Sequence, residues 1–289
     1  MSTPSLSALP IRRLTPRDLR ACADLSEDRG WPREEHKWGL LLSAGTGYGI
    51  DDPDGPGLIG AYVVTQYGAP QRPGLAAIGM VLVAERYARR GIGRRMMQHA
   101  VEEAATTPLT LHATPNGRPL YEQLGFKAIG RAEMLRGRLE PRGPLPGIAT
   151  RPATAEDLTA ILRLDTEVFG QDRMHVITRL PAFTDQLRVA EADGAIIGYA
   201  GAWPNMETHV VGPLIARDTE TAKALIASLG AATDRPLRTD IDVRHEELLA
   251  WAKESGLQSV AFNAVMAYGT PELPGDWTRR FAPLTVAAG

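Results

Sequence analysis

The sequence predicts an α/β fold built as two similar domains in tandem. The chain has 289 residues, which favours two domains at roughly 100–200 residues per domain. In the first half, aliphatic segments typical of strands alternate with amphipathic segments typical of helices. The pattern Arg-x-x-Thr-x-x-Asp-Leu begins at Arg12 and again at Arg151, and in both copies the threonine can cap a helix. Duplication of one structural unit explains this repeat most economically.

A segment rich in proline and glycine separates the two halves. Residues 140–147 contain three prolines and two glycines, which interrupt both helix and strand patterns. We therefore predict a first domain over residues 1–140, a linker over 141–149 and a second domain over 150–289.

The elements expected in the first half are strand, strand, glycine loop, helix, strand, helix and strand. They are strands over 58–65 and 75–83, a helix over 94–105, a strand over 109–113, a helix from Thr114 to Gly125 and a strand after it. The first helix carries an apolar stripe that includes Met96, Met97 and Ala100. The second helix starts with a cap residue followed by a proline, Thr114-Pro115, and a glycine closes it. This order predicts a layered mixed α/β fold.

Composition and charge exclude several classes of function. The net charge of −2 gives no general positive field for nucleic acid or an anionic membrane, so neither partner is expected. The single cysteine, Cys22, is expected in the core, and no Cys/His spacing suits a metal. The longest apolar run, residues 75–84, is too short to span a membrane, and residues 1–14 lack the pattern of a secretory signal. We expect a cytoplasmic protein.

A glycine loop over residues 86–94 is the clearest candidate binding site. Gly91 and Gly93 remove side chains where the backbone turns into a helix, whose first amides have no partner within the helix. These amides, with the nearby side chains of Arg89, Arg90 and Arg94, predict a site for a diphosphate. The alternative is a solvated basic turn. The loop lacks the pattern of a nucleoside triphosphate loop, and Met96 replaces the third glycine of a dinucleotide fingerprint.

Two motifs together resemble the GNAT superfamily of N-acetyltransferases. One is the strand, the loop Ala88-Arg-Arg-Gly-Ile-Gly93 and the helix; the other is Leu120-Tyr-Glu-Gln-Leu-Gly-Phe126. The resemblance implies acetyl-CoA as co-substrate and mostly antiparallel twisted sheets with a central splay; no metal is expected, because no Cys/His cluster has ligand spacing. It places the diphosphate of CoA on Arg89, Arg90, Gly91, Ile92, Gly93 and Arg94, and the pantetheine arm on the backbone of Val81, Leu82 and Val83.

Two positions depart from the family pattern. Ala88 stands where the family has arginine or glutamine, and Thr114 stands where an asparagine is common seven residues before the tyrosine. Thr114 can still cap the helix, but it offers the pantetheine arm fewer hydrogen bonds than asparagine does. We therefore still expect the cofactor to bind, but with different side-chain contacts at these two positions.

The resemblance also assigns catalytic roles. Tyr121 is expected beside the thioester sulfur, where it would protonate the departing thiolate; the alternative is a helix residue with its ring in the core. His112, on the preceding strand, lies where relatives often carry glutamate, and an imidazole pKa near 6.5 would suit a base. The alternative for His112 is a packed strand residue. Backbone amides near Leu82 and Val83 would polarise the thioester carbonyl.

The acceptor amine is expected to bind the segment over residues 25–38. Its acidic and aromatic residues could receive a cationic or aromatic amine; they are Glu27, Asp28, Trp31, Glu34, Glu35 and Trp38. The alternative is a solvated helix with two buried tryptophans.

The second half has a similar order of elements but lacks the residues expected to bind CoA and to catalyse transfer. No glycine follows its strand over residues 209–214, and Asp218 and Glu220 place negative charge at the next helix start. Ala252 stands at the position of Tyr121 when both are counted back from the closing glycine. This half resembles the degenerate second domain of tandem GNAT proteins. In it, Asp172 and Arg173 either shape the acceptor pocket or hold a loop.

These observations predict an acyl-CoA-dependent N-acetyltransferase. It would move acetyl from acetyl-CoA to a primary amine of a small molecule or peptide by direct attack in a ternary complex, because no activated nucleophile is evident. Two alternatives remain: a non-catalytic CoA-binding sensor or scaffold, and transfer of a longer acyl group. The sequence leaves open the identity of the amine and the oligomeric state, a homodimer included.

Overall fold

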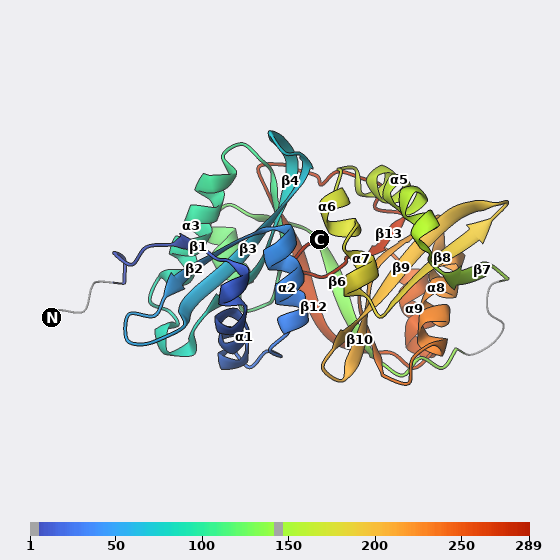
Figure 1. The fold of residues 1–289 in the computed structure, drawn as a ribbon, viewed down its shortest axis with the longest axis horizontal. Coiled ribbons are helices and arrows are strands. Elements are labelled where there is room, and N and C mark those ends of the chain that lie inside the picture. Colours follow the sequence, from blue (N-terminus) through green and yellow to red (C-terminus); the bar gives the residue numbers. More distant parts are fainter. Residues whose placement is uncertain (1–5, 142–146) are drawn as a thin grey trace.

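The computed structural model of the chain describes residues 6–141 and 147–289. Within these residues, thirteen strands form one mixed sheet that runs through both halves of the molecule (Figure 1). The strand order is β1-β2-β3-β4-β5-β12-β6-β11-β10-β9-β8-β7, and β13 pairs with β10. The α/β prediction with two similar halves is confirmed. Part of the predicted linker, residues 142–146, lies outside the described residues.

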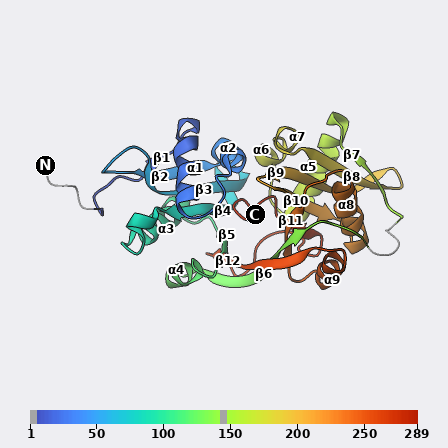
Figure 2. The same ribbon diagram turned by 90° about the horizontal axis from the view of Figure 1, so that it is seen from below.

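The first half contains the expected elements, and the helices α1 and α2 and the strands β1 and β2 precede them. Its helices are α1 (Leu19–Asp28), α2 (Glu35–Ala44), α3 (Ile92–Ala104) and α4 (Arg118–Gln123). Its strands are β1 (Arg12–Arg13), β2 (Thr46–Asp51), β3 (Leu58–Ala69), β4 (Arg72–Val83), β5 (Leu109–Ala113) and β6 (Lys127–Gly137). Helices α1 and α2 cover one face of the sheet, and α3 and α4 lie on the other (Figure 2). Cys22 is fully buried in α1, as expected.

The second half repeats this plan. Its helices are α5 (Leu158–Phe169), α6 (Met174–Ile177), α7 (Leu180–Phe183), α8 (Thr219–Ala231) and α9 (Glu246–Glu254). Its strands are β7 (Ala149–Pro152), β8 (Gln186–Ala192), β9 (Ala195–Asn205), β10 (Thr208–Ala216), β11 (Leu237–Asp242), β12 (Gln258–Tyr268) and β13 (Arg280–Ala282).

The repeated sequence pattern forms the same structure in both halves. Arg12 Nη2 lies 2.8 Å from Asp18 Oδ1, and Arg151 Nη1 lies 2.6 Å from Asp157 Oδ2. In each copy the threonine between the two residues forms a capping box with the aspartate. The arginine thus holds the acid that begins the first helix of each half.

The two halves exchange their last long strands. Strand β12 of the second half lies between β5 and β6 of the first half, and β6 in turn pairs with β11 of the second half. The two exchanged strands run side by side along the middle of the molecule (Figure 2). The sheet therefore crosses the predicted boundary at residue 140 in both directions, which a strand pattern alone does not reveal.

Strands β4 and β5 separate soon after they meet. They pair in parallel only at Ala76–Leu109 and Ala77–Thr110, although β4 continues to Val83. A register shift in the pairing of β3 with β4 and a positive φ of 54° at Met80 bend β4 away. The resulting wedge confirms the central splay that the resemblance implies.

The chain segment after β13 closes one end of this wedge. The backbone of Ala287 lies so near Gly79 that a Cβ added to that glycine would be 2.2 Å from the Ala287 carbonyl oxygen. Ala287 and Ala288 are buried in the core of the first half. Gly79 is therefore required because only a residue without a side chain admits this close approach.

In the described ranges no helix is long and apolar enough to cross a membrane. In the same ranges no group of three or more His, Cys, Asp or Glu side chains is placed to hold a metal ion.

Candidate active site

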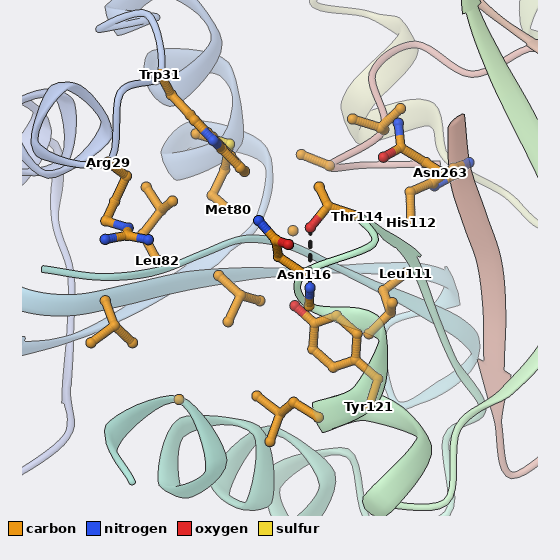
Figure 3. A pocket seen from close by; sticks show the side chains of 18 of the residues that line it. Arg29, Trp31, Met80, Leu82, Leu111, His112, Thr114, Asn116, Tyr121 and Asn263 are labelled. Atoms are coloured by element: carbon orange, nitrogen blue, oxygen red, sulfur yellow. Dashed lines mark hydrogen bonds between the residues drawn. The ribbon is translucent and has the colours of Figure 1, made fainter. Parts of the chain in front are cut away.

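A cavity of about 1000 Å³ opens between the separated strands and extends to the junction of the two halves (Figure 3). Its walls come from β4, the start of α3, the end of β5, α4, the segment between α1 and α2, β12 and the segment after β13. Both halves of the chain therefore contribute to one site.

The glycine loop forms one end of the cavity. Helix α3 begins after Gly91, which has φ of 85°, and among the described residues no side chain caps its first turn. The first backbone bond of the turn runs from Arg95 N to Gly91 O, so the amides of residues 92–94 remain available to a ligand. A Cβ added at Gly91 would meet nothing within 4 Å, so the space beside the turn is open.

Most of the residues that were predicted to bind a ligand at this end do line the cavity. They are Arg89, Gly91, Ile92, Gly93 and Arg94, and Ala88 joins them. Arg90 does not; its guanidinium lies 5.3 Å from the centroid of the Tyr87 ring.

The middle of the cavity runs along β4. Val81, Leu82 and Val83 line it, as expected. On one side β4 pairs with β3 through Leu82 and Val83. The β5 side of these residues has no strand partner, since the pairing with β5 ends at Ala77. An extended ligand can therefore add to this open strand edge through main-chain hydrogen bonds.

Thr114 lies in the turn that precedes α4, and Tyr121 lies within the helix; α4 begins at Arg118 and not at Thr114 as expected. Thr114 Oγ1 accepts a hydrogen bond of 3.2 Å from Gly117 N (Figure 3). Tyr121 reaches the cavity although its side chain is nearly buried, and burial raises its pKa to about 12. The phenol is thus protonated at neutral pH and able to donate a hydrogen bond.

His112 lines the cavity from β5, opposite Val265 of β12. Burial and the positive charge of Arg280 lower its pKa to about 4, and a hydrogen bond to the backbone of Val286 opposes that shift. This pKa lies well below the ordinary imidazole value near 6.5, because burial and a nearby positive charge both disfavour the charged ring. His112 is neutral at neutral pH.

Two of the six residues expected to bind the acceptor line the cavity, namely Trp31 and Glu34. Trp31 is 38% exposed. Trp38 is fully buried, and its Nε1 donates a hydrogen bond of 2.9 Å to Ser26 Oγ. Trp38 is therefore part of the core.

The remaining acids of that segment are engaged elsewhere. Glu27 and Glu35 both pair with Arg33. Asp28 Oδ2 accepts a hydrogen bond of 2.6 Å from the backbone of Glu85. Of the four acids expected there, only Glu34 thus lines the cavity, because neighbouring donors engage the other three.

Several residues of the cavity wall were given no role on the basis of the sequence. They are Lys37, Asn116, Arg238, Asn263, Val286 and Ala287. Asn116 follows Thr114 by two residues in the same turn, so the motif around Thr114 could have predicted that Asn116 lies at the site. The others come from positions that only the strand exchange and the path of the last residues bring to the site.

The second half lacks an open loop at the corresponding place. Asp218 precedes α8, and its Oδ1 accepts a hydrogen bond of 2.8 Å from Thr221 N. The protein's own carboxylate thus occupies the helix start, as expected. Ala252 is fully buried in α9.

Asp172 and Arg173 lie outside the cavity wall. Arg173 forms a buried ion pair with Asp165, with Nη2 2.8 Å from Oδ1. Asp172 Oδ1 accepts a hydrogen bond of 2.7 Å from Met174 N. Of the two roles considered for Asp172 and Arg173, the structure thus favours holding a loop.

Comparison with known proteins agrees with this geometry. A family model described as an acetyltransferase (GNAT) domain matches residues 61–137, and a second model with the same description matches residues 161–282. The chain belongs to the GNAT acetyltransferase family. This GNAT chain is 28% identical over 234 residues to a Bacillus subtilis protein described as uncharacterized N-acetyltransferase YitH, covering 80% of this chain and 79% of that protein.

Solved structures share the whole fold. A putative acetyltransferase from Pyrococcus horikoshii superposes with a TM-score of 0.81 at 20% identity, covering 100% of this chain and 99% of that one. A tandem GNAT protein from the clavulanic acid biosynthesis pathway gives a TM-score of 0.65 at 15% identity, covering 91% and 99%. The tandem GNAT arrangement is therefore confirmed.

Proposed function

We propose that this protein is an N-acetyltransferase that moves acetyl from acetyl-CoA to a primary amine of a small molecule or peptide. One observation carries the proposal: a single cavity joins the open start of α3, the unpaired edge of β4 and Tyr121, then continues to the junction of the halves. The attack would be direct within a ternary complex, because Cys22 is buried and burial raises the pKa of its thiol to about 12.

The residues present suit acetyl-CoA. Free amides at residues 92–94, with Arg89 and Arg94, would hold the diphosphate. The open edge of β4 at Val81, Leu82 and Val83 would hold the amide-bearing pantetheine arm as an added strand. Thr114 stands where the arm would end, near Tyr121.

The raised pKa of Tyr121 decides how it acts. A thiol has a pKa of about 8.5, so complete proton transfer from a phenol of pKa about 12 would be uphill by about 5 kcal/mol. A hydrogen bond from the phenol to the developing thiolate carries no such cost. We therefore assign Tyr121 the role of a hydrogen-bond donor that stabilises the leaving sulfur.

The lowered pKa of His112 decides when it acts. An alkylamine has a pKa of about 10, so a base of pKa about 4 cannot deprotonate the ammonium form. The amine must therefore arrive neutral. His112 would take a proton only after nitrogen has bonded to the carbonyl carbon, when the N–H becomes far more acidic.

The test is thiol release from acetyl-CoA across a broad panel of primary amines. We expect release with the wild-type protein and a loss of turnover of about 100-fold in Tyr121→Phe, with acetyl-CoA affinity nearly unchanged. Tyr268→Phe is the matched control, since Tyr268 packs on Phe126 with ring centroids 5.2 Å apart and does not line the cavity.

Two other outcomes would change the assignment. Binding of acetyl-CoA without thiol release with any amine would contradict turnover and support a CoA-binding sensor or scaffold. Faster release from butyryl-CoA than from acetyl-CoA would point to a longer acyl donor.

A further inference from the structure

The part of the cavity at the junction of the two halves is lined by positive side chains from both halves of the chain. Lys37 extends from α2 and Arg238 from β11, and both line the cavity. Lys37 is 5% exposed. Charged groups are rarely buried in this way unless they are paired or await a ligand.

Lys37 is only partly paired. Its Nζ contacts Glu34, the only carboxylate of the described residues that lines this cavity. The other oxygen of Glu34 accepts a hydrogen bond of 2.8 Å from Asn205 Nδ2. Both oxygens of Glu34 are thus engaged, while the ammonium of Lys37 keeps further N–H groups. Burial lowers the pKa of Lys37, so an anion beside it would stabilise the charged form.

Arg238 is weakly paired. Its nearest carboxylate contact joins Nη2 to Asp240 Oδ2 at 3.5 Å, whereas strong charge-assisted hydrogen bonds are about 2.7–2.9 Å long. Its Nε is buried and has no partner among the described residues. Because that atom has almost no accessible surface, a ligand in the cavity would contact the other nitrogens of the guanidinium, where a carboxylate would add to the weak pairing with Asp240.

The remaining charges near this end do not supply the missing acceptor from the cavity wall. Arg29 lines the cavity and pairs with Glu85, which does not line it. Asn263, on β12, is neutral and buried. Asp240, which is buried and does not line the cavity, lies close enough to Lys37 and Arg238 to interact with both charges, and one of its oxygens has no partner among the described residues. On the cavity wall itself, Lys37 and Arg238 thus have one neighbouring carboxylate, that of Glu34.

We propose that the acceptor is an amino acid or related amine with a carboxylate, which Lys37 and Arg238 bind while the amine points toward His112. A guanidinium and an ammonium facing one space match a carboxylate, which can bridge them. This inference rests on the proposed function, and it replaces the expectation that acids would bind a cationic amine. The second domain then acts in substrate choice, because β11 supplies Arg238.

The first test needs only the wild-type protein. Thiol release from acetyl-CoA is measured with the common amino acids, with their carboxamides and with the corresponding decarboxylated amines. We expect kcat/KM to be about 10- to 100-fold higher for the preferred amino acid than for its carboxamide, as for a hydrogen bond to a charged group. Equal rates for the two, or a preference for the decarboxylated amine, would overturn the inference.

The second test uses variants. Arg238→Gln and Lys37→Met should raise KM for the amino acid with little change in kcat, and they should abolish the difference between acid and carboxamide. Arg136→Gln is the matched control, because Arg136 lies opposite Arg238 on β6 but does not line the cavity. Retention of the acid preference in both cavity variants would contradict the assignment.

The two proposals fail in different ways. If no amine of any class releases thiol, the proposed function fails. If neutral amines release thiol as well as amino acids do, acetyl transfer stands and only the carboxylate site is wrong.

Discussion

The substitution Gly91→Asp would place a carboxylate at the start of α3, as Asp218 does at the start of α8 in the second half. The new carboxylate would stand at the start of α3, where φ of 85° suits glycine and is also tolerated by aspartate and asparagine. A Cβ there meets nothing within 4 Å, so the protein should still fold. At a separation of about 5 Å and an effective dielectric constant of about 20, two unit charges repel by about 3 kcal/mol. We expect acetyl-CoA affinity to fall by more than about 100-fold.

Isothermal titration calorimetry with acetyl-CoA would measure this loss, and Gly91→Asn is its control. Asparagine has the same shape and backbone tolerance without the charge, so it should retain most of the affinity. The gap between the two variants should narrow at about 1 M salt, where screening acts within about 3 Å. Equal affinities for the aspartate and asparagine variants would refute electrostatic recognition of a diphosphate at this loop.

Three further predictions concern His112, Asp218 and the exchanged strands. Because the pKa of His112 is lowered to about 4, its side chain stays neutral from pH 5 upward. We therefore expect kcat/KM to rise with pH in step with the neutral fraction of the amine. An inflection near pH 6.5 that the His112→Gln variant lacks would contradict this. Asp218→Ala should lower the free energy of unfolding by about 1 kcal/mol in urea titrations through loss of the cap, whereas a change in acetyl-CoA affinity would argue for a second site. A chain ending at residue 140 lacks β12 and should show no cooperative unfolding by circular dichroism; a sharp transition would show that the first half folds alone.

Local sequence patterns predicted the local parts of the site well. The start of α3, the edge of β4 and the turn into α4 each depend on residues adjacent in sequence, and the structure places Gly91, Val83 and Tyr121 around one cavity as expected. The repeat of Arg12 at Arg151 likewise predicted two similar helix starts. Glycines, caps and strand periodicity act over a few residues, so a single sequence reveals them.

The properties that the sequence did not predict depend on contacts between segments far apart in the chain. The pKa of His112 follows from burial by β12 and from Arg280, which lies far along the chain. Arg238 reaches the cavity only because β6 pairs with β11. The acids near Trp31 were assigned to the acceptor site from their charge, but ion pairs and hydrogen bonds with neighbouring donors engage most of them outside the cavity.

The exchange of β6 and β12 also ties the assembly of the cavity to the order of synthesis. The loop that would hold CoA is made before β11, β12 and Val286, which line the same cavity. A nascent chain therefore lacks part of the cavity wall until these segments of the second half have been made. Because each half places a strand beside the other, substitutions at the junction should affect both halves.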